Sequence, residues 1–225
     1  MKRSVAWLAP VLLSIAVSAV MVGAALWYVA ARRAASPSPA AAGKSVQLPY
    51  RDVILGREDA PVTIVEYGDY QCFFCLQFFA DTEAMLRDRY IQSGRVRMVF
   101  RDFAVLGPES VLAAEAAACA KDQGKFWAYH DLLYAAEGRD LQENSGTFTE
   151  DLFMTIAERL NLDVEKFRSC VQDRKYREEI QQEIRAAKAM GVQGTPTFFI
   201  NGEKFEGYLS GPQLERILSK MLQSP

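Results

Sequence analysis

Histidine is almost absent from this sequence and cysteine is scarce: His130 is the only imidazole among 225 residues, and there are four cysteines. A structural zinc site takes about four nitrogen or sulfur ligands from short paired motifs. Cys72 and Cys75 would supply one pair, but Cys119 and Cys170 lie far apart and His130 has no ligand beside it. We therefore expect no metal and no other cofactor. Nothing near His130 completes a hydrolase triad, so we interpret it as a hydrogen-bonded helix residue.

Acidic residues are absent from the N-terminal part of the chain, where none precedes Asp52. Residues 34–225 carry 22 basic and 28 acidic side chains, so the body of the protein is mildly acidic. It has no basic stripe of the kind that attracts phosphate backbones, which argues against a nucleic-acid partner. Half of all residues are apolar, enough for one well-buried core.

Residues 4–31 contain no charged side chain and are rich in Ala, Val, Leu and Ile. A helix of roughly 20 such residues spans a bilayer core, and Trp7 and Trp27 stand where aromatic rings favour the membrane–water interface. We expect residues 1–33 to form a cytoplasmic tip and transmembrane anchor. Residues 34–50 are rich in Pro, Ser and Ala, which is typical of a semi-extended linker.

A cleaved signal peptide is the alternative for this segment, because Ala40 to Ala42 offer small residues suited to a cleavage site. The apolar region of a signal peptide is usually about 7–15 residues long, shorter than the run seen here. We therefore favour a retained anchor. Both interpretations export the rest of the chain.

The exported part shows strand patterns at two separate places. Residues 62–67 and 96–103 are β-branched and apolar, as in buried strands, and residues 197–205 form a hairpin across Asn201-Gly202, a strong type I′ turn signal. Residues 107–189 have helical periodicity, with helices expected at 111–120, 126–136, 148–160 and 164–189. A further helix includes Leu214 and Leu218. The order predicts a mixed sheet, residues 51–106 and 190–225, interrupted by an all-helical insertion, residues 107–189.

The chemistry is expected at Cys72 and Cys75, which stand where the first strand gives way to a helix. Two cysteines three residues apart at a helix start can close a small disulfide ring. The helix N-terminus favours the thiolate form of the first cysteine, which attacks disulfides, and the second can resolve the mixed disulfide. A zinc half-site and a purely structural staple are the alternatives. The first lacks its second half, and the second does not explain the position at the helix start.

Two segments of the sequence resemble the DsbA-like thioredoxin-fold oxidoreductases. Residues 60–75, Ala-Pro-Val-Thr-Ile-Val-Glu-Tyr-Gly-Asp-Tyr-Gln-Cys-Phe-Phe-Cys, resemble that family's first central strand and active-site helix. Residues 191–202, Gly-Val-Gln-Gly-Thr-Pro-Thr-Phe-Phe-Ile-Asn-Gly, are similar to its cis-proline loop and hairpin. With the helical insertion the resemblance covers residues 53–222. It implies an α/β thioredoxin-like fold. In this chain that fold would follow the expected N-terminal transmembrane helix.

The resemblance also implies roles for individual residues. Pro196 would be cis and face the cysteine pair, with the backbone of Thr195 pairing with an extended substrate. Glu66 matches the family's buried acid near the resolving cysteine and would take the proton from Cys75. The alternative for Glu66 is a hydrogen-bonded strand residue, and for residues 194–197 a simple turn before a strand.

This sequence departs from the family's oxidases between the two cysteines. Phe73 and Phe74 stand where those oxidases have Pro or His, so no imidazolium assists the Cys72 thiolate. We therefore expect a reduction potential less oxidising than about −120 mV. The two phenylalanines would extend an apolar surface for unfolded peptide substrates; ordinary packing at the helix start is the alternative, above all for Phe74.

Cys119 and Cys170 both belong to apolar stripes of the helical insertion. Free buried thiols are one interpretation, since cysteine packs as a small hydrophobic residue. Export to an oxidising compartment and the even number of cysteines favour a disulfide instead. Some DsbA-like relatives carry such a helix-to-helix bridge. We expect a structural Cys119–Cys170 disulfide.

Together these patterns predict a membrane-tethered thiol–disulfide oxidoreductase that forms disulfides in exported proteins, with Cys72 as nucleophile and Cys75 as resolving cysteine. It would be a single-pass protein of the inner or cytoplasmic membrane, with its catalytic domain on the periplasmic or extracytoplasmic side. Its partners would be exported proteins bearing thiols or disulfides and a quinone-linked membrane oxidase. A disulfide reductase or isomerase supplied by a membrane thiol-reductant transporter, and a non-catalytic peptide-binding chaperone module, are the alternatives.

Overall fold

The computed structural model describes residues 53–138 and 142–223. The expected anchor, residues 1–33, and the expected linker, residues 34–50, lie outside the described residues, so both stay predictions. Within the described part of the chain, no helix combines the length and the apolar character needed to cross a membrane.

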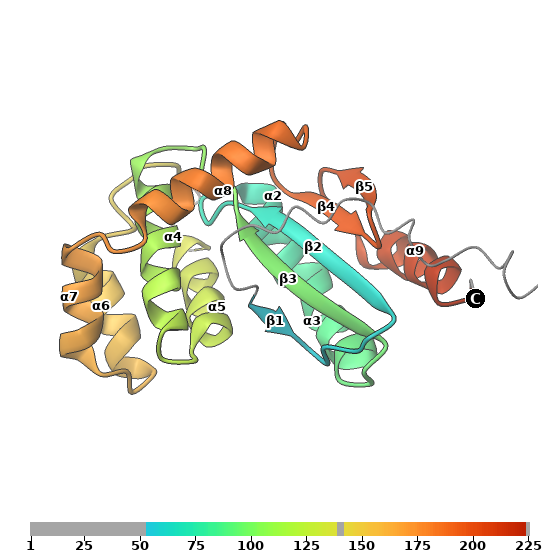
Figure 1. Ribbon diagram of the computed structural model, residues 1–225, viewed down its shortest axis with the longest axis horizontal. Coiled ribbons are helices and arrows are strands. Elements are labelled where there is room, and N and C mark those ends of the chain that lie inside the picture. Colours follow the sequence, from blue (N-terminus) through green and yellow to red (C-terminus); the bar gives the residue numbers. More distant parts are fainter. Residues whose placement is uncertain (1–52, 139–141, 224–225) are drawn as a thin grey trace, which may run out of the picture. The chain divides into compact units, whose positions relative to one another are not determined.

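A mixed five-stranded sheet forms the centre of the described fold, with the strand order β1-β3-β2-β4-β5 (Figure 1). Strand β2 is parallel to β3, and the other neighbouring pairs are antiparallel. The strand regions expected from the sequence are confirmed, whereas β1 has only two residues, too few for a periodic pattern to predict. The strands are β1 (Ile54–Leu55), β2 (Val62–Gly68), β3 (Val96–Asp102), β4 (Thr197–Ile200) and β5 (Glu203–Glu206).

Strand β2 is central, and apolar groups cover both of its faces. Val62 and Ile64 belong to one hydrophobic core, which they share with Phe78 and Leu214. Tyr67 belongs to a second core, which is built mainly from the helical insertion. β-Branched residues suit such a strand because their stiff side chains pack well on a pleated surface.

One layer of the fold comes from the helical segment between β2 and β3 and from the C-terminal helix. Phe78 and Leu86 of this layer are fully buried beside Leu214 and Leu218 of α9. The connection allows β2 and β3 to run parallel, since parallel neighbours need a long crossover. Its elements are α2 (Phe73–Phe78), the π-helical η1 (Phe79–Glu83), α3 (Ala84–Leu86) and the π-helical η2 (Arg87–Ile91), and the C-terminal helix is α9 (Gly211–Gln223).

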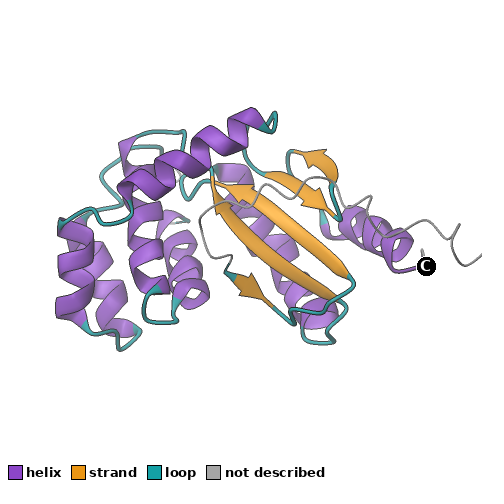
Figure 2. Cartoon of the chain, viewed as in Figure 1, coloured by secondary structure: helices purple, strands orange, loops and turns teal. Residues whose placement is uncertain are grey.

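Between β3 and β4 the chain forms an insertion whose described residues form helices joined by loops and no strand (Figure 2). Two of its helices begin with side-chain caps: Thr149 accepts a hydrogen bond from the Leu152 amide, and Asp163 accepts one from the Lys166 amide. Such caps satisfy backbone donors that a helix start leaves unpaired. The helices are α4 (Pro108–Lys121), α5 (Phe126–Glu137), α6 (Glu150–Arg159), α7 (Val164–Gln172) and α8 (Arg177–Ala189).

The prediction of one continuous helix over residues 164–189 is wrong, because the chain turns between α7 and α8. Arg174 adopts a left-handed conformation with φ of 49°. Its guanidinium binds the Glu115 carboxylate of α4 at 2.7 and 2.9 Å. The turn contains no Gly or Pro, so these contacts with α4 rather than local propensity fix it.

The hairpin between β4 and β5 follows the sequence prediction. Asn201 and Gly202 have φ angles of 47° and 86°, which is the left-handed pair that a type I′ turn requires. The Asn201 side chain also accepts a hydrogen bond from the Thr63 amide at 2.8 Å. The turn therefore ties the hairpin to the central strand.

Cys119 of α4 and Cys170 of α7 form a disulfide with an S–S distance of 2.01 Å across a sequence separation of 51. The expected helix-to-helix bridge is thus present in the structure. It joins two helices of the insertion and leaves Cys72 and Cys75 as free thiols.

Replacing both Cys119 and Cys170 with alanine is expected to lower the free energy of unfolding by about 4 kcal/mol, because a cross-link of this span restricts the unfolded chain. Urea denaturation of the oxidised protein measures the change. The alkylation rate of Cys72 should stay unchanged, since the bridge lies within the insertion. An unaltered urea midpoint would contradict the stabilising role.

Candidate active site

Cys72 stands at the carboxyl end of β2, directly before α2, in an extended conformation with φ of −76° and ψ of 118°. Its carbonyl accepts a hydrogen bond from the Leu76 amide, so Cys72 is the N-cap residue of the helix. The sulfur therefore lies near the unpaired amides of the first helical turn. Cys72 is 7% exposed and Cys75 is fully buried.

The environment of Cys72 favours its thiolate. A hydrogen bond from the Cys75 thiol, a hydrogen bond from Thr195 and the backbone amides of Phe74 and Cys75 lower the pKa of Cys72 to about 6, against the opposing effect of partial burial. At neutral pH the first cysteine is thus largely ionised, and the thiolate is the form that attacks disulfides.

The second cysteine behaves in the opposite way. Burial, followed by its hydrogen bond to Cys72 and the negative charges of Cys72 and Glu66, raises the pKa of Cys75 well above its ordinary value. Cys75 is therefore a neutral thiol that donates to the Cys72 sulfur. The two thiols therefore differ in charge, with Cys72 ionised and Cys75 neutral, and their roles as nucleophile and resolving cysteine stay predictions.

The loop before β4 brings residues from more than a hundred positions away to the cysteine pair. The Thr195–Pro196 peptide bond is cis. The Cys72 sulfur lies 3.2 Å from the Thr195 carbonyl oxygen, and the Pro196 carbonyl accepts a hydrogen bond from the Gly207 amide at 2.9 Å. The structure therefore places Thr195 and Pro196 against Cys72.

Glu66 lies within β2, opposite Phe100 of β3 and Phe198 of β4, and is 1% exposed. Burial, then the negative charges of Glu83 and Cys72, raise the pKa of Glu66 well above its ordinary value. It also interacts electrostatically with Cys75. Glu66 is thus a buried carboxyl group with a raised affinity for its proton, and its expected role as the base for Cys75 stays a prediction.

Asp69 is a site residue that the sequence reasoning missed. Its carboxylate accepts hydrogen bonds from the amides of Gln71, Val105 and Leu106 at 2.8–3.0 Å. Burial raises the pKa of Asp69, while these hydrogen bonds act in the opposite direction. The carboxylate thereby joins the active-site turn to the loop after β3. The bond to Gln71, two residues on, is a typical Asx turn, and that pattern is a signal in the sequence.

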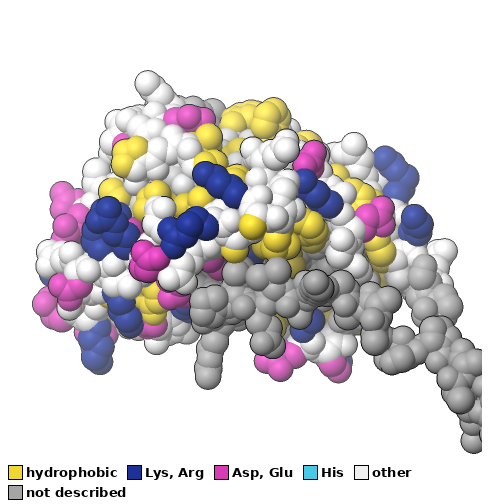
Figure 3. Space-filling model, turned by 45° about the horizontal axis from the view of Figure 1, so that its top comes forward, with side chains coloured by type: hydrophobic (Ala, Val, Ile, Leu, Met, Phe, Trp, Pro, Cys, Tyr) yellow, Lys and Arg dark blue, Asp and Glu magenta, His cyan; other side chains and the backbone are white. Residues whose placement is uncertain are grey.

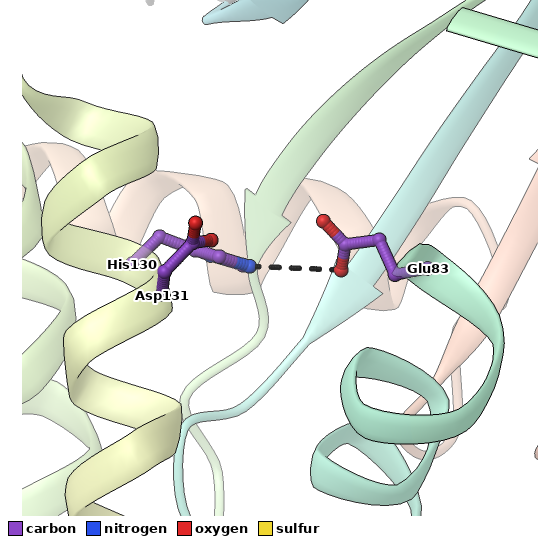
Figure 4. Close-up of side chains that lie close together, drawn as sticks. All are labelled: Glu83, His130 and Asp131. Carbon is purple, nitrogen blue, oxygen red and sulfur yellow. Dashed lines mark ion pairs between the residues drawn. The ribbon is translucent and has the colours of Figure 1, made fainter. Parts of the chain in front are cut away.

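A second group missed from the sequence consists of Glu83 of η1, Arg87 of η2, and His130 and Asp131 of α5. Figure 4 shows Glu83, His130 and Asp131. Imidazole and carboxylate groups are also metal ligands, and the ligand atoms of Glu83, His130 and Asp131 lie within 4.8 Å of one another. The Arg87 guanidinium, however, already binds both carboxylates, at 2.5 and 2.6 Å. We therefore interpret the group as an ion-pair network.

Two of the exposed apolar side chains, Phe73 and Phe74, stand between the two cysteines in the sequence. Among the described residues, the exposed large hydrophobic side chains are Phe73, Phe74, Val105 and Met190. Phe73 and Phe74 are each about half exposed. The backbone amide of Val105 donates a hydrogen bond to the Asp69 carboxylate. The Met190 sulfur accepts a hydrogen bond from the Tyr67 hydroxyl. Figure 3 shows hydrophobic patches among the polar side chains of one face of the molecule.

Comparison with known proteins shows what the chain is similar to. A family model described as Thioredoxin matches residues 50–220. Over 152 residues the chain is 34% identical to the probable disulfide bond formation protein D of Bacillus anthracis, a match that covers 66% of this chain and 69% of that protein. It is 40% identical over 161 residues to the Na(+)/H(+) antiporter NhaA 1 of Salinispora arenicola. That match covers 71% of this chain but only 23% of the antiporter.

The solved structures show a similar fold. The crystal structure of oxidised BdbD from Bacillus subtilis matches with a TM-score of 0.70 at 26% sequence identity. The match covers 77% of this chain and 94% of that chain. The mixed α/β fold with its helical insertion is therefore thioredoxin-like, as the sequence predicted.

The alkylation rate of Cys72 is expected to follow an ionisation with a midpoint at about pH 6. Stopped-flow measurement with iodoacetamide on the reduced protein tests this value. In the Cys75→Ala variant the midpoint should rise by about one unit or more, because the largest stabilising contribution to the thiolate is lost. A wild-type midpoint at about pH 8.5, the value of an unperturbed thiol, would contradict the lowered pKa of Cys72.

Proposed function

The chain belongs to the thioredoxin family, among its DsbA-like members, and we propose that it is a membrane-tethered thiol–disulfide oxidoreductase that forms disulfides in exported proteins. The observation that carries the proposal is the asymmetry of the cysteine pair: an ionised Cys72 at a helix start and a protonated, buried Cys75. Cys72 also lies beside Thr195 of the cis Thr195–Pro196 bond. A structural staple or a non-catalytic peptide-binding module would not need this difference in charge between the two cysteines.

Oxidation of a substrate takes two exchange steps. A substrate thiolate attacks the Cys72 sulfur of the Cys72–Cys75 disulfide, and Cys75 leaves and takes a proton from Glu66. A second substrate thiolate then attacks the substrate sulfur of the mixed disulfide and releases Cys72 as a thiolate. The substrate loses two electrons and gains a disulfide, and the enzyme is left as a dithiol. The low pKa of Cys72 makes it a good leaving group in the second step.

Reoxidation reverses these roles and requires a membrane partner with a disulfide of its own, for which a quinone-linked oxidase is the expected class. The Cys72 thiolate attacks the partner disulfide. Cys75 then gives its proton to Glu66 and attacks the Cys72 sulfur, which releases the partner thiolate. Glu66 suits this role because it is buried with Cys75: after it has given its own proton to the departing Cys75, its raised pKa makes it a stronger base than an ordinary carboxylate.

Substrate binding would use the surface around Cys72. An extended peptide would pair with the backbone of Thr195 beside Pro196. The half-exposed rings of Phe73 and Phe74 would contact apolar side chains, which unfolded exported proteins present and folded ones bury.

The proposed location and organisation follow from the sequence. Residues 4–31 are uncharged and apolar over a length that spans a bilayer. We assign residues 1–33 to the anchor, 34–50 to a linker, 51–106 and 190–225 to the thioredoxin-like domain and 107–189 to the helical insertion. The Cys119–Cys170 disulfide supports an extracytoplasmic position, because such bonds persist in oxidising compartments.

The reduction potential of the Cys72–Cys75 couple tests the direction of transfer. The Cys72 pKa of about 6 lies between the values of thioredoxin, about 7, and DsbA, about 3.5. We therefore expect a potential between about −270 mV and about −120 mV. Equilibration of the full-length protein in detergent with glutathione buffers, followed by mass spectrometry, gives the value. A potential at or below about −270 mV would contradict the oxidase assignment and favour a disulfide reductase.

A further inference from the structure

Two local hydrogen bonds form the turn that leads into Cys72. The Cys72 amide donates to the Asp69 carbonyl at 3.0 Å, and the Gln71 amide donates to the Asp69 carboxylate at 2.9 Å. Both donors are backbone groups, so the turn itself does not require a glutamine at position 71. The Gln71 side chain makes its contacts outside this turn.

The side chain of Gln71 is buried and bonds to two separate segments of the helical insertion. Gln71 is 3% exposed. Its Nε2 atom donates to the Ser110 hydroxyl of α4 at 2.7 Å, and its Oε1 atom accepts a hydrogen bond from the Asn144 amide at 2.5 Å. Because the Asn144 group is a backbone donor, it requires the oxygen of the Gln71 amide on its side. The residue directly before Cys72 is thus bound to the insertion through both ends of its amide group.

Ser110 bonds to the active-site turn at two points. It lies in the first turn of α4 and is fully buried. Burial raises the pKa of Asp69, and the hydrogen bonds that oppose this rise include one from the Ser110 side chain. Asp69, Gln71 and Ser110 therefore form a closed set of contacts between the turn and the start of the insertion.

Asn144, the second partner of Gln71, is itself held at the same end of α4. Its side chain donates to the Leu106 carbonyl at 2.9 Å and accepts a hydrogen bond from the Glu109 amide at 3.4 Å. The Glu109 carboxylate accepts hydrogen bonds from two further amides of the loop before α6, at 2.8 and 3.0 Å. Gln71 therefore contacts a loop that is bound to α4.

We propose that Gln71 is a positioning residue for disulfide exchange: through Ser110 and Asn144 it fixes the peptide that carries Cys72, so that the Cys72 sulfur stays aligned with Cys75. The proposal rests on the proposed roles of the two cysteines. In the resolving step Cys75 gives its proton to Glu66, its sulfur bonds to the Cys72 sulfur of the mixed disulfide, and the partner sulfur leaves as a thiolate. This step is intramolecular, so its rate depends on how well the two sulfurs are held in the reacting geometry.

The resolving step can be separated from the attack that precedes it. Reduced full-length protein in detergent is mixed with excess oxidised glutathione, quenched with acid at timed intervals and analysed by mass spectrometry. Formation of the Cys72–glutathione adduct is bimolecular, whereas its decay into the Cys72–Cys75 disulfide is first order. The first rate reports the reactivity of Cys72, and the second reports its alignment with Cys75.

Gln71→Met keeps the length of the side chain but removes both contacts with the insertion. Decay of the adduct should slow about tenfold, because misplacement of reacting groups by about 1 Å can cost up to about a hundredfold in rate. Adduct formation at about pH 9, where Cys72 is fully ionised, should change less than about twofold, since it needs only an exposed thiolate. The alkylation midpoint of Cys72 should rise by at least about half a unit, because the Cys75 thiol donates to it less well.

Gln123→Met is the matched control. The Gln123 side chain bridges two segments of the insertion in the same way: it accepts a hydrogen bond from the Asp163 amide at 2.7 Å and donates to the Asp163 carbonyl at 3.2 Å. The substitution removes a similar pair of bonds without touching the active-site turn, so both rates and the midpoint should keep their wild-type values. An equal slowing of adduct decay in Gln123→Met would overturn the proposal, because any loosening of the insertion would then suffice.

Ser110→Ala tests the same contact from the other side, and alanine is compatible with its place in α4. Adduct decay should slow about threefold. Gln71→Met should add less slowing in this background than in the wild type, because the two residues share one contact. Fully additive effects contradict the proposal. Should Gln71→Met fail to fold, a wild-type decay rate in Ser110→Ala overturns the role of Gln71.

The outcomes separate this proposal from the one on which it rests. Adduct decay at the wild-type rate in Gln71→Met overturns the role of Gln71 and leaves the roles of Cys72 and Cys75 standing. A fall of both rates by the same factor also overturns it, because alignment with Cys75 is then not the affected property. If the wild type forms no Cys72 adduct, or its adduct never converts to the Cys72–Cys75 disulfide, the proposed roles of the cysteines are themselves wrong.

Discussion

The hydrogen bond from the buried Cys75 thiol to the Cys72 sulfur is the interaction on which the rest of this site depends. It is the largest contribution that lowers the pKa of Cys72 to about 6, and the same contact helps to keep the proton on Cys75. The two cysteine side chains are chemically identical, but the protein lowers the pKa of Cys72 and raises that of Cys75. Cys72 is therefore suited to attack disulfides, whereas Cys75 keeps its proton. Burial strengthens the separation, because Cys75 has no water to stabilise its charged form.

Several elements of the fold hold the two cysteines in this arrangement. Strand β2 delivers the cysteines to a helix start and buries Glu66 beneath them. The loop before β4 places Thr195 over Cys72, and the Asp69 carboxylate binds the active-site turn to the loop after β3. The insertion contributes as well, because His130 of α5 contacts the Tyr70 hydroxyl and faces Glu83. A polar network inside the protein therefore contacts the turn that precedes Cys72.

Much of this architecture could be predicted from the sequence, because local signals mark it. The β-branched run of β2, the Asn201-Gly202 turn and the periodic helices carry their own patterns, and the cysteine spacing indicates the chemistry. The network of Glu83, Arg87 and His130 could not be predicted, since its members come from elements that meet only in the folded chain. The break at Arg174 was missed for a similar reason: a tertiary ion pair, not a Gly or Pro, sets it.

The central claim, that Cys72 exchanges disulfides with other proteins and Cys75 resolves them, is tested most directly by trapping. Full-length Cys75→Ala protein is produced in a bacterial envelope, free thiols are blocked by alkylation, and the protein is separated without reductant. The account predicts disulfide-linked adducts that disappear on reduction and are absent when Cys72 is also replaced by alanine. Adduct levels in Cys75→Ala no higher than in the double variant would contradict it.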